Sequence, residues 1–250
     1  MKVATWNVNG IRARAPQLRE WLEQERPDLV CLQEIKATPD QVPRDLCELG
    51  DHWCFWHGAR AYSGVGLLVR RELSPARPES GHPPFDHDCR IVVVELGDLA
   101  VASVYVPNGN RDLPGKLRFL EAMVAWAAQH RGSGRPLLIC GDVNVARTDA
   151  DVHPKERKPG LVGQLPEERA LLERLLAEGD LVDLGRALHP EDDRLYTWWA
   201  PWRNLRQRNI GWRIDYVLAS APLAARATAS VVMREVGTSD HGPVVVTFGT

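Results

Sequence analysis

The sequence of 250 residues lacks any apolar run near the roughly 20 residues that a bilayer-spanning helix needs. Its first residues, 1–7, enter a strand-like pattern at once, which leaves no room for a signal peptide. These two absences argue against a membrane span and against secretion. We therefore expect a cytoplasmic protein without a membrane partner.

Cysteine is scarce, with five residues and no C-x-x-C pair. Such an arrangement indicates neither a disulfide framework nor a cysteine-based zinc site. Buried free thiols are the better interpretation, and they fit a reducing compartment. The cysteines are Cys31, Cys47, Cys54, Cys89 and Cys140.

An excess of basic charge is also absent, because the formal net charge is −2. The chain as a whole is therefore no basic nucleic-acid binder, and any such binding has to come from local charge. Hydrophobic content of 44% and charged content of 26% are ordinary for a globular protein. No linker rich in proline, glycine or serine divides the chain, so we expect one domain over residues 1–250.

Short apolar runs alternate with amphipathic segments and predict an α/β fold. The runs typical of buried strands are 3–6, 29–32, 65–69, 91–94, 99–105, 137–140, 216–218 and 244–246. Amphipathic helices are predicted at 16–25, 116–129 and 166–178. The mixed order of these elements favours sheets covered by helices over an alternating strand-helix array. Residues 80–88 and 149–165 are predicted surface loops.

Polar side chains gather where the predicted strands end. They are Asn7, Asn9, Gln33, Glu34, Asp142, Asn144, Asp215, Asp240 and His241. A turn or a helix cap explains any one of them as well as catalysis does. Five strand ends with such residues favour an active site, because α/β folds assemble active sites there. The segments 6–9 and 141–144 also resemble each other, as two related halves would.

The residue types indicate a metal-dependent reaction. Oxygen ligands without cysteine suit magnesium or manganese. Glu34 is the natural first ligand, and Asn7 offers a neutral oxygen beside it. His241 supplies an imidazole, and the sequence leaves open whether Asp215 or Asp240 orients it.

Segment 196–213 concentrates aromatic and basic residues: four of the nine tryptophans alternate there with four arginines. Such a segment suits phosphate contact and stacking on bases or on a deoxyribose. The alternative is that the tryptophans fill the core and the arginines cover it. We predict the core for Trp199 and a pocket for Trp198 and Trp212.

Six motifs occur in one order along residues 3 to about 248: TWNVNG (5–10), LQEIK (32–36), YVPN (105–108), GDVN (141–144), GWRIDY (211–216) and SDH (239–241). Together they resemble the exonuclease III branch of the endonuclease/exonuclease/phosphatase superfamily. The resemblance implies a four-layer α/β sandwich, in which two mixed β-sheets pack face to face and are flanked by helices. It also implies a DNA repair nuclease that cuts 5′ to abasic sites in double-stranded DNA, with 3′→5′ exonuclease and 3′-phosphatase activities.

The resemblance also implies roles for individual residues. The metal ligands would be Asn7, Glu34 and Asp240. The residues at the scissile phosphate and its attacking water would be Tyr105, Asp142, Asn144, Asp215 and His241. The substrate-binding residues would be Asn9, Arg111, Trp198, Trp202, Arg206, Trp212 and Ile214. Trp198, Trp212 and Ile214 would wall a slot for the abasic sugar, and Arg111 and Trp202 would insert at the lesion.

The expected cofactor is Mg²⁺, with Mn²⁺ as a substitute, and the expected partner of this monomer is damaged double-stranded DNA or a blocked 3′ end. Two other functions stay open. One is another phosphoesterase of the superfamily, acting on RNA, inositol phosphates or lipids; the aromatic residues of 209–216 argue against it. The other is a catalytically silent DNA-binding module, against which every expected catalytic position is filled.

Overall fold

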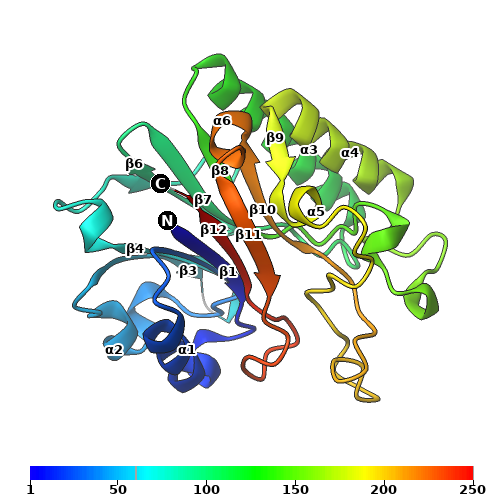
Figure 1. Ribbon diagram of the computed structural model, residues 1–250, viewed down its shortest axis with the longest axis horizontal. Helices are drawn as coiled ribbons and strands as arrows, with labels where there is room; N and C mark the ends of the chain where they lie inside the picture. Colours follow the sequence, from blue (N-terminus) through cyan, green and yellow to red (C-terminus); the bar gives the residue numbers. More distant parts are fainter. Residues whose placement is uncertain (60, 250) are drawn as a thin grey trace.

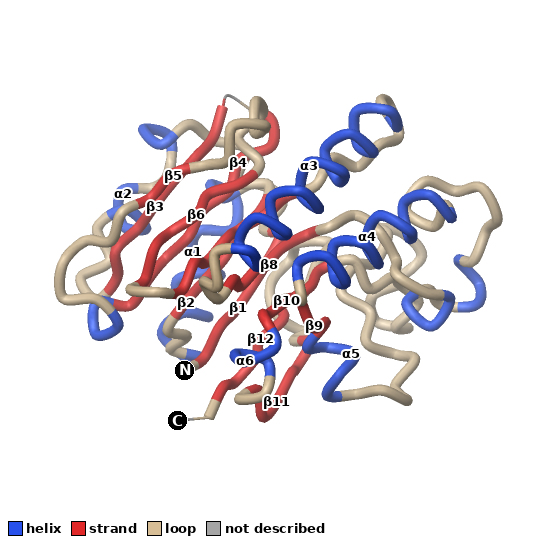
Figure 2. Tube along the Cα trace, turned by 90° about the horizontal axis from the view of Figure 1, so that it is seen from above, coloured by secondary structure: helices blue, strands red, loops and turns tan. Residues whose placement is uncertain are grey.

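The computed structural model describes residues 1–59 and 61–249. Two six-stranded sheets pack face to face, and helices cover the outer face of each (Figures 1 and 2). The four-layer α/β sandwich is thereby confirmed. Strand β1 at the N-terminus lies beside β12 near the other end of the chain (Figure 1). The N-terminal amine donates to the carbonyl oxygen of Phe248 at 2.9 Å.

The first sheet has the strand order β11-β12-β1-β2-β4-β3. Its strands are β1 (Lys2–Asn7), β2 (Leu29–Gln33), β3 (His52–Ala59), β4 (Tyr62–Arg70), β11 (Ala227–Val232) and β12 (Val244–Phe248). Of its pairings only β1 with β2 is parallel.

The second sheet has the order β5-β6-β7-β8-β10-β9. Its strands are β5 (Ser80–Gly81), β6 (Ile91–Leu96), β7 (Leu99–Tyr105), β8 (Leu137–Asp142), β9 (Leu181–Asp183) and β10 (Asp215–Ser220). Here too one pair, β7 with β8, is parallel within an otherwise antiparallel sheet. The two sheets therefore share one plan, as the similar segments 6–9 and 141–144 suggested.

Helices cover both sheets. The first sheet carries α1 (Ile11–Glu25) and α2 (Arg44–Cys47), and the second carries α3 (Leu113–Gly132) and α4 (Pro166–Gly179). The short helices are α5 (Leu184–Leu188), α6 (Ala221–Ala224) and the 3₁₀ turns η1 (Pro39–Gln41), η2 (Arg71–Leu73), η3 (Asp149–Asp151) and η4 (Pro154–Glu156). Among the described residues no helix is both long and apolar enough to cross a membrane.

The buried apolar residues form one layer between the sheets and one layer under each pair of helices. Val3 and Leu67 of the first sheet share the middle layer with Leu138 of the second. Leu18 of α1 and Leu172 of α4 belong to the two outer layers. Each sheet is packed against apolar residues on both of its faces. Its central strands therefore appear in the sequence as continuous apolar runs.

Two predictions about elements were wrong. Helix α1 begins at Ile11 instead of 16, because Gly10 (φ 103°) turns the chain straight from β1 into the helix, and Pro16 lies inside it. As a proline inside the helix, Pro16 lacks one backbone hydrogen bond and its ring crowds the preceding turn. The four edge strands β3, β5, β9 and β11 were not predicted. Strands β5 and β9 have only two and three residues, and β11 begins with small and polar residues. Strand β3 contains the apolar run 53–56, which the prediction overlooked.

Candidate active site

The site begins at the ends of β1 and β8, where the chain makes the same turn twice. The Asn9 N–H donates to Asn7 Oδ1 at 3.0 Å, and the Asn144 N–H donates to Asp142 Oδ1 at 2.9 Å. Asn9 and Asn144 both have left-handed backbones, with φ of 45° and 55°. Asparagine tolerates this conformation better than most residues, and its side chain favours such turns. The repeated turn explains why the two segments have similar sequences.

Asn7 joins the two sheets at this point. Its Nδ2 donates to Glu34 Oε1 at 3.0 Å and to Asp142 Oδ2 at 2.9 Å. Asn7 is fully buried, and Glu34, just past β2, has the unusual φ of 50°. Backbone strain of this kind persists where the surrounding structure enforces it, often at functional sites. Glu34 and Asp142 are therefore held within reach of one ligand.

A histidine and two aspartates complete the centre. His241 Nδ1 lies 2.8 Å from Asp215 Oδ2, and its Nε2 lies 3.8 Å from Asp142 Oδ2. Strand pairing fixes this arrangement, because Asp215 and Asp142 are register partners between β10 and β8. All three are at least 97% buried. The carboxylate that orients His241 is thus Asp215 and not its sequence neighbour Asp240.

The charges of this centre shift its pKa values. Burial lowers the pKa of His241, but the carboxylates of Asp215, Asp142 and Asp240 outweigh burial and raise it to about 10. Burial raises the pKa of Asp142 to about 8; Asp215 and Glu34 add to this effect, and His241 opposes it. At neutral pH an imidazolium therefore stands beside a carboxyl group with high proton affinity, a pairing suited to acid-base chemistry.

Glu34 and Tyr105 have opposite roles as acceptor and donor. Burial raises the pKa of Glu34, but hydrogen bonds from Asn7 and Lys36 outweigh burial, so this pKa is lowered and the group stays ionised. Burial and the charges of Glu34 and Asp142 raise the pKa of Tyr105, which keeps its phenol protonated. Tyr105 can therefore donate a hydrogen bond to an anion in the site.

The cluster has the donors for a divalent cation. Ligand atoms of Glu34, Asp142 and His241 lie within 4.8 Å of one another. A third carboxylate, Asp215, leaves its buried Oδ1 without a hydrogen-bond partner. Carboxylate oxygens of this kind are the donors that hard dications prefer. The residues present therefore fit a metal ion.

Asp240 lies beside this cluster and connects it to the aromatic segment. Its Oδ1 accepts from Asn9 Nδ2 at 2.8 Å, and its Oδ2 accepts from Trp198 Nε1 at 3.0 Å. Lys36 Nζ holds the other end of Asn9, donating to its Oδ1 at 2.6 Å. Both Asp240 oxygens already have donors, so its role as a metal ligand stays a prediction.

The predicted slot for an abasic sugar is largely covered. Trp198 and Trp212 pack edge to face with ring centroids 5.5 Å apart. Trp212 is 8% exposed and Ile214 is 5% exposed, whereas Trp198 is partly exposed. The accessible edge of this apolar cluster is therefore Trp198. Trp199 is 1% exposed, as predicted for the core.

Arg206 was predicted to contact substrate, and the structure gives it another role. Its guanidinium donates to the backbone carbonyls of Arg234 (2.6 Å), Val236 (2.7 Å), Gly237 (3.4 Å) and, at still shorter range, Ser239. These bonds engage the Nε and both terminal nitrogens. Arg206 shapes the loop before His241 instead of reaching for a phosphate.

Arg213 corrects the interpretation of the arginine-rich segment further. It is 3% exposed, donates to Asp151 Oδ1 at 2.7 Å, and forms two 2.8 Å bonds to Asp183. Its positive charge is thus neutralised by two buried aspartates inside the protein. The network fixes the backbone just before Ile214 and Asp215.

Two predicted DNA contacts do lie on open surface. Arg111 is exposed and lines a groove of about 820 Å³ that reaches Glu34 and Tyr105. Trp202 is 59% exposed and lines a second groove, which reaches Asp240. Their insertion at a lesion stays a prediction.

The sequence-based prediction missed Lys116. This lysine is fully buried, its Nζ donates to the carbonyls of Asn144 (2.7 Å) and Asn108 (3.1 Å), and it pairs with Glu168 at 2.5 Å. It therefore holds together the loops that follow β7 and β8. The available signal was a lysine on the apolar face of the predicted helix 116–129. Asn144 also bonds these loops, through Nδ2 to the carbonyl of Val106 at 2.9 Å.

Comparison with known proteins yields consistent matches along the chain. The model of the Endonuclease/Exonuclease/phosphatase family matches residues 4–241. The DNA repair nuclease APEX1 of Danio rerio is 32% identical over 258 residues, which cover 98% of this chain and 81% of that protein.

Solved structures match over nearly the whole length. The 3′-5′ exonuclease NExo from Neisseria meningitidis superimposes with a TM-score of 0.90 at 30% identity, covering 99% of each chain. A structure of NExo from Neisseria described as a 3′ phosphatase is bound to a product DNA hairpin. An AP endonuclease from Archaeoglobus fulgidus superimposes with a TM-score of 0.89 at 28% identity, covering 100% of each chain.

Proposed function

The chain belongs to the endonuclease/exonuclease/phosphatase family, and we propose that it is a DNA repair nuclease that hydrolyses the phosphodiester 5′ to an abasic site in double-stranded DNA. The observation that carries this proposal is the convergence of Glu34, Asp142, Asp215 and His241 in one buried cluster. The names of its relatives, a DNA repair nuclease and an AP endonuclease, support the substrate class.

The cation of this reaction is Mg²⁺ in our proposal, with Mn²⁺ able to replace it. Glu34 and Asn7 would hold the ion, with Asp240 as a further ligand, because carboxylate and amide oxygens suit hard cations. Asn7 would have to turn toward the ion its oxygen, which accepts the Asn9 N–H. When bound, the ion supplies positive charge to the non-bridging oxygens of the phosphate.

Asp142 prepares the attacking water. Its ionised form takes the proton from the water; this form is the minority at pH 7, because burial raises the pKa of Asp142 to about 8, but a pKa near the working pH favours proton transfer. The Asn144 N–H holds Oδ1 of Asp142 in place, and Asn7 holds Oδ2. We propose that the Asn144 side chain orients the water beside it.

His241 and Tyr105 bind the phosphate as donors. His241 is protonated at neutral pH and directs Nε2 into the centre, where it donates to a phosphoryl oxygen. Asp215 fixes the ring through Nδ1 and keeps it charged. The protonated phenol of Tyr105 donates a second hydrogen bond.

Damage recognition depends on the surfaces around this centre. Flipping a sugar out of the duplex is cheapest where no base remains to unstack. Trp198, backed by Trp212 and Ile214, presents an apolar edge beside Asp240 for such a sugar. Arg111 and Trp202 are exposed and available for contact with the helix at the lesion.

The test is an incision assay on a duplex with one tetrahydrofuran site and on the same duplex without the lesion. We expect incision 5′ to the lesion with a 3′-hydroxyl product, and little incision of the undamaged strand. Active protein that hydrolyses inositol phosphates or RNA but not this duplex would replace the proposal with another phosphoesterase of the family.

A second activity, removal of blocked 3′ ends, is favoured by the matches to an exonuclease and 3′ phosphatase. The same cluster serves it, because a 3′-terminal phosphate places the same P–O3′ bond beside His241. Duplexes with a recessed 3′-phosphate or 3′-hydroxyl end, compared with the tetrahydrofuran duplex, give the ratio of the three activities. A 3′-phosphatase rate far above the incision rate would make end repair the main function.

We propose further that the protein acts as a monomer in a reducing compartment, the cytoplasm. One chain supplies every residue named for the site, and the five cysteines are free. Equilibrium sedimentation with and without DNA tests the first statement. A dimer that alone cleaves DNA would contradict it.

A further inference from the structure

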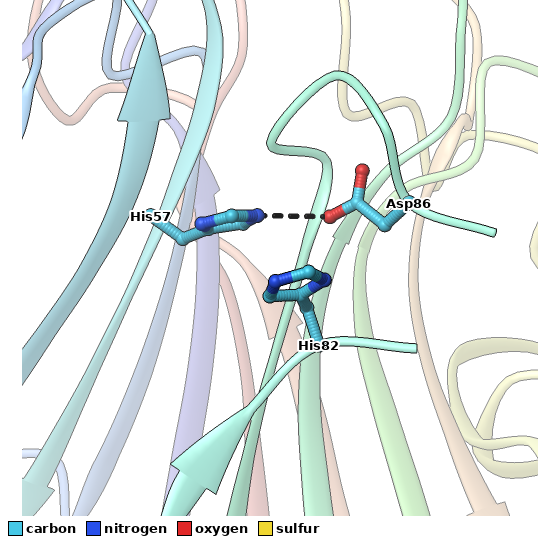
Figure 3. Close-up of side chains that lie close together, drawn as sticks. All are labelled: His57, His82 and Asp86. Carbon is cyan, nitrogen blue, oxygen red and sulfur yellow. Dashed lines mark hydrogen bonds and ion pairs between the residues drawn. The ribbon is translucent and has the colours of Figure 1, made fainter. Parts of the chain in front are cut away.

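A second cluster of metal-binding side chains lies apart from the nuclease centre. His57 on β3, His82 just after β5, and Asp86 come together there, with ligand atoms within 4.8 Å of one another (Figure 3). His57 Nε2 lies 3.2 Å from Asp86 Oδ2, and the two imidazole rings stack with centroids 4.5 Å apart. Three segments distant in sequence thus present two imidazoles and one carboxylate to the same point.

The carboxylate of Asp86 is held firmly in this orientation. Its side chain is fully buried, and it accepts the backbone N–H groups of Arg90 at 2.9 Å and Ile91 at 2.8 Å. Burial raises its pKa, but the hydrogen bonds from His57 and from these two N–H groups outweigh burial and lower it. These backbone hydrogen bonds hold the carboxylate in place, and bonds of this kind orient a ligand toward its metal ion.

His82 is the adjustable member of the set. It is exposed, and among the described residues its ring forms one long hydrogen bond, 3.4 Å from Nδ1 to the carbonyl oxygen of Pro83. Its side chain can therefore turn a ring nitrogen toward an ion shared with His57 and Asp86 without breaking buried contacts. An ion would reach the cluster from this open side.

The spacing of the fixed pair matches a metal site. A tetrahedral ion with bonds of about 2.0 Å separates neighbouring ligand atoms by about 3.3 Å. His57 Nε2 and Asp86 Oδ2 lie at 3.2 Å, so both could bind one ion with little movement. Two imidazoles with a carboxylate suit Zn²⁺ and related transition metals better than Mg²⁺.

We propose that His57, His82 and Asp86 form a binding site for Zn²⁺ or a chemically similar transition-metal ion. The ion takes the place of the hydrogen between His57 Nε2 and Asp86, and that proton passes to solvent. Solvent water fills the remaining coordination position. No sequence motif indicates this site, because its ligands come from three separate segments of the chain.

The site connects β3 to the wall of the nuclease groove. Residues 82–90 contribute Phe85, His87 and Arg90 to the lining of the groove that contains Glu34 and Tyr105. The Arg90 guanidinium lies 5.0 Å from the centre of the Tyr105 ring. A bound ion therefore stiffens this wall.

The test separates this site from the nuclease centre and reads binding directly. The protein carries Glu34→Gln and Asp142→Asn to disable the central cluster, and Co²⁺ or Zn²⁺ is titrated by calorimetry and by the visible absorption of cobalt. We expect one equivalent to bind and the thermal midpoint to rise. Adding His82→Ala should weaken binding by at least about tenfold. Loss of a residue that merely hydrogen-bonds a metal ligand already costs roughly that much affinity.

The matched control is His87→Ala in the same background, because His87 is exposed in the same segment but is absent from the cluster. It should leave the affinity unchanged. No binding in the disabled background, or equal binding after His82→Ala, would overturn the proposal. Since the assay measures neither cleavage nor DNA binding, its outcome is independent of the proposed nuclease activity.

Discussion

At the scale of single residues, two carboxylates of the active site receive opposite properties from their surroundings. Glu34 is held ionised by Asn7 and Lys36, whereas burial and the charges of its neighbours raise the proton affinity of Asp142. The first property suits a ligand for a cation, and the second suits a proton acceptor. Environment, more than residue type, therefore separates the two roles.

Asp215→Asn tests the orientation of His241. An amide cannot supply the charge that keeps the imidazole protonated, so we expect kcat to fall roughly 10²–10⁴-fold, the range typical of a lost acid-base group. DNA binding should change little. Asp98→Asn, at an exposed carboxylate, is the control and should keep full activity. Unchanged turnover in Asp215→Asn would refute the role of the pair.

Lys116→Met tests the buried lysine that joins two active-site loops. Removing its charge leaves Glu168 unpaired, and breaking a buried pair costs about 3 kcal/mol of unfolding free energy. We also expect kcat to fall because the backbone at Asn144 is released. Urea unfolding and single-turnover cleavage measure the two effects.

Arg131→Met, at an exposed position of the same helix, is the control for the loss of one positive charge. Lys116→Arg should recover part of the activity if the amino group acts by positioning. Loss of stability with unchanged kcat in Lys116→Met would reduce its role to packing.

At the scale of elements, polar residues after apolar runs predicted the site because a strand places its end at a fixed sheet edge. The β1 and β8 turns carry Asn7 and Asp142 for this reason. The arginines of segment 196–213 were less predictable. Arg206 and Arg213 bind backbone carbonyls and buried carboxylates that lie far away in sequence, and composition does not indicate such partners.

Asp151→Asn tests the network that fixes the backbone just before Asp215. Burial raises the pKa of Asp151, but Arg213 and Arg186 outweigh it and lower this pKa below 3.8. A carboxylate with a lowered folded pKa stabilises the fold above its unfolded pKa and loses this contribution as pH falls through the folded value. The variant should therefore be less stable by about 3 kcal/mol at pH 7.

Urea midpoints of wild type and Asp151→Asn should keep a constant difference from pH 7 to near 3.8 and converge only below it. Convergence already near neutral pH would contradict the lowered pKa.

At the scale of the whole molecule, the four layers could be predicted where strands are buried on both faces. Runs such as 65–69 and 137–140 are unbroken because helices cover one side and the other sheet covers the opposite side. The edge strand β11 exposes one face and has few large apolar residues, whereas β3 packs on both faces through the run 53–56, which the prediction overlooked. The resemblance to a known family supplied the layer order, which periodicity alone does not give.

DNA affinity should depend steeply on salt, although the net charge is −2. Each phosphate contact made by a basic side chain releases counterions and adds about 0.9 to the slope of log affinity against log salt. Arg111→Ala, in the groove, removes one such contact and should lower the magnitude of this slope by about 0.9. Arg131→Ala, outside that lining, should leave it unchanged. A flat salt response in wild type would contradict an arginine-lined DNA surface.

The central claim is that Glu34, Asp142, Asp215 and His241 act together around one cation and one DNA phosphate. Single-turnover incision of the tetrahydrofuran duplex, with a chelator and then with added Mg²⁺, tests it most directly in wild type and Glu34→Gln. The account predicts that the chelator abolishes wild-type incision, that Mg²⁺ restores it, and that Glu34→Gln binds the duplex but cuts it far more slowly. Incision that persists in the chelator, or at an unchanged rate in Glu34→Gln, would contradict it.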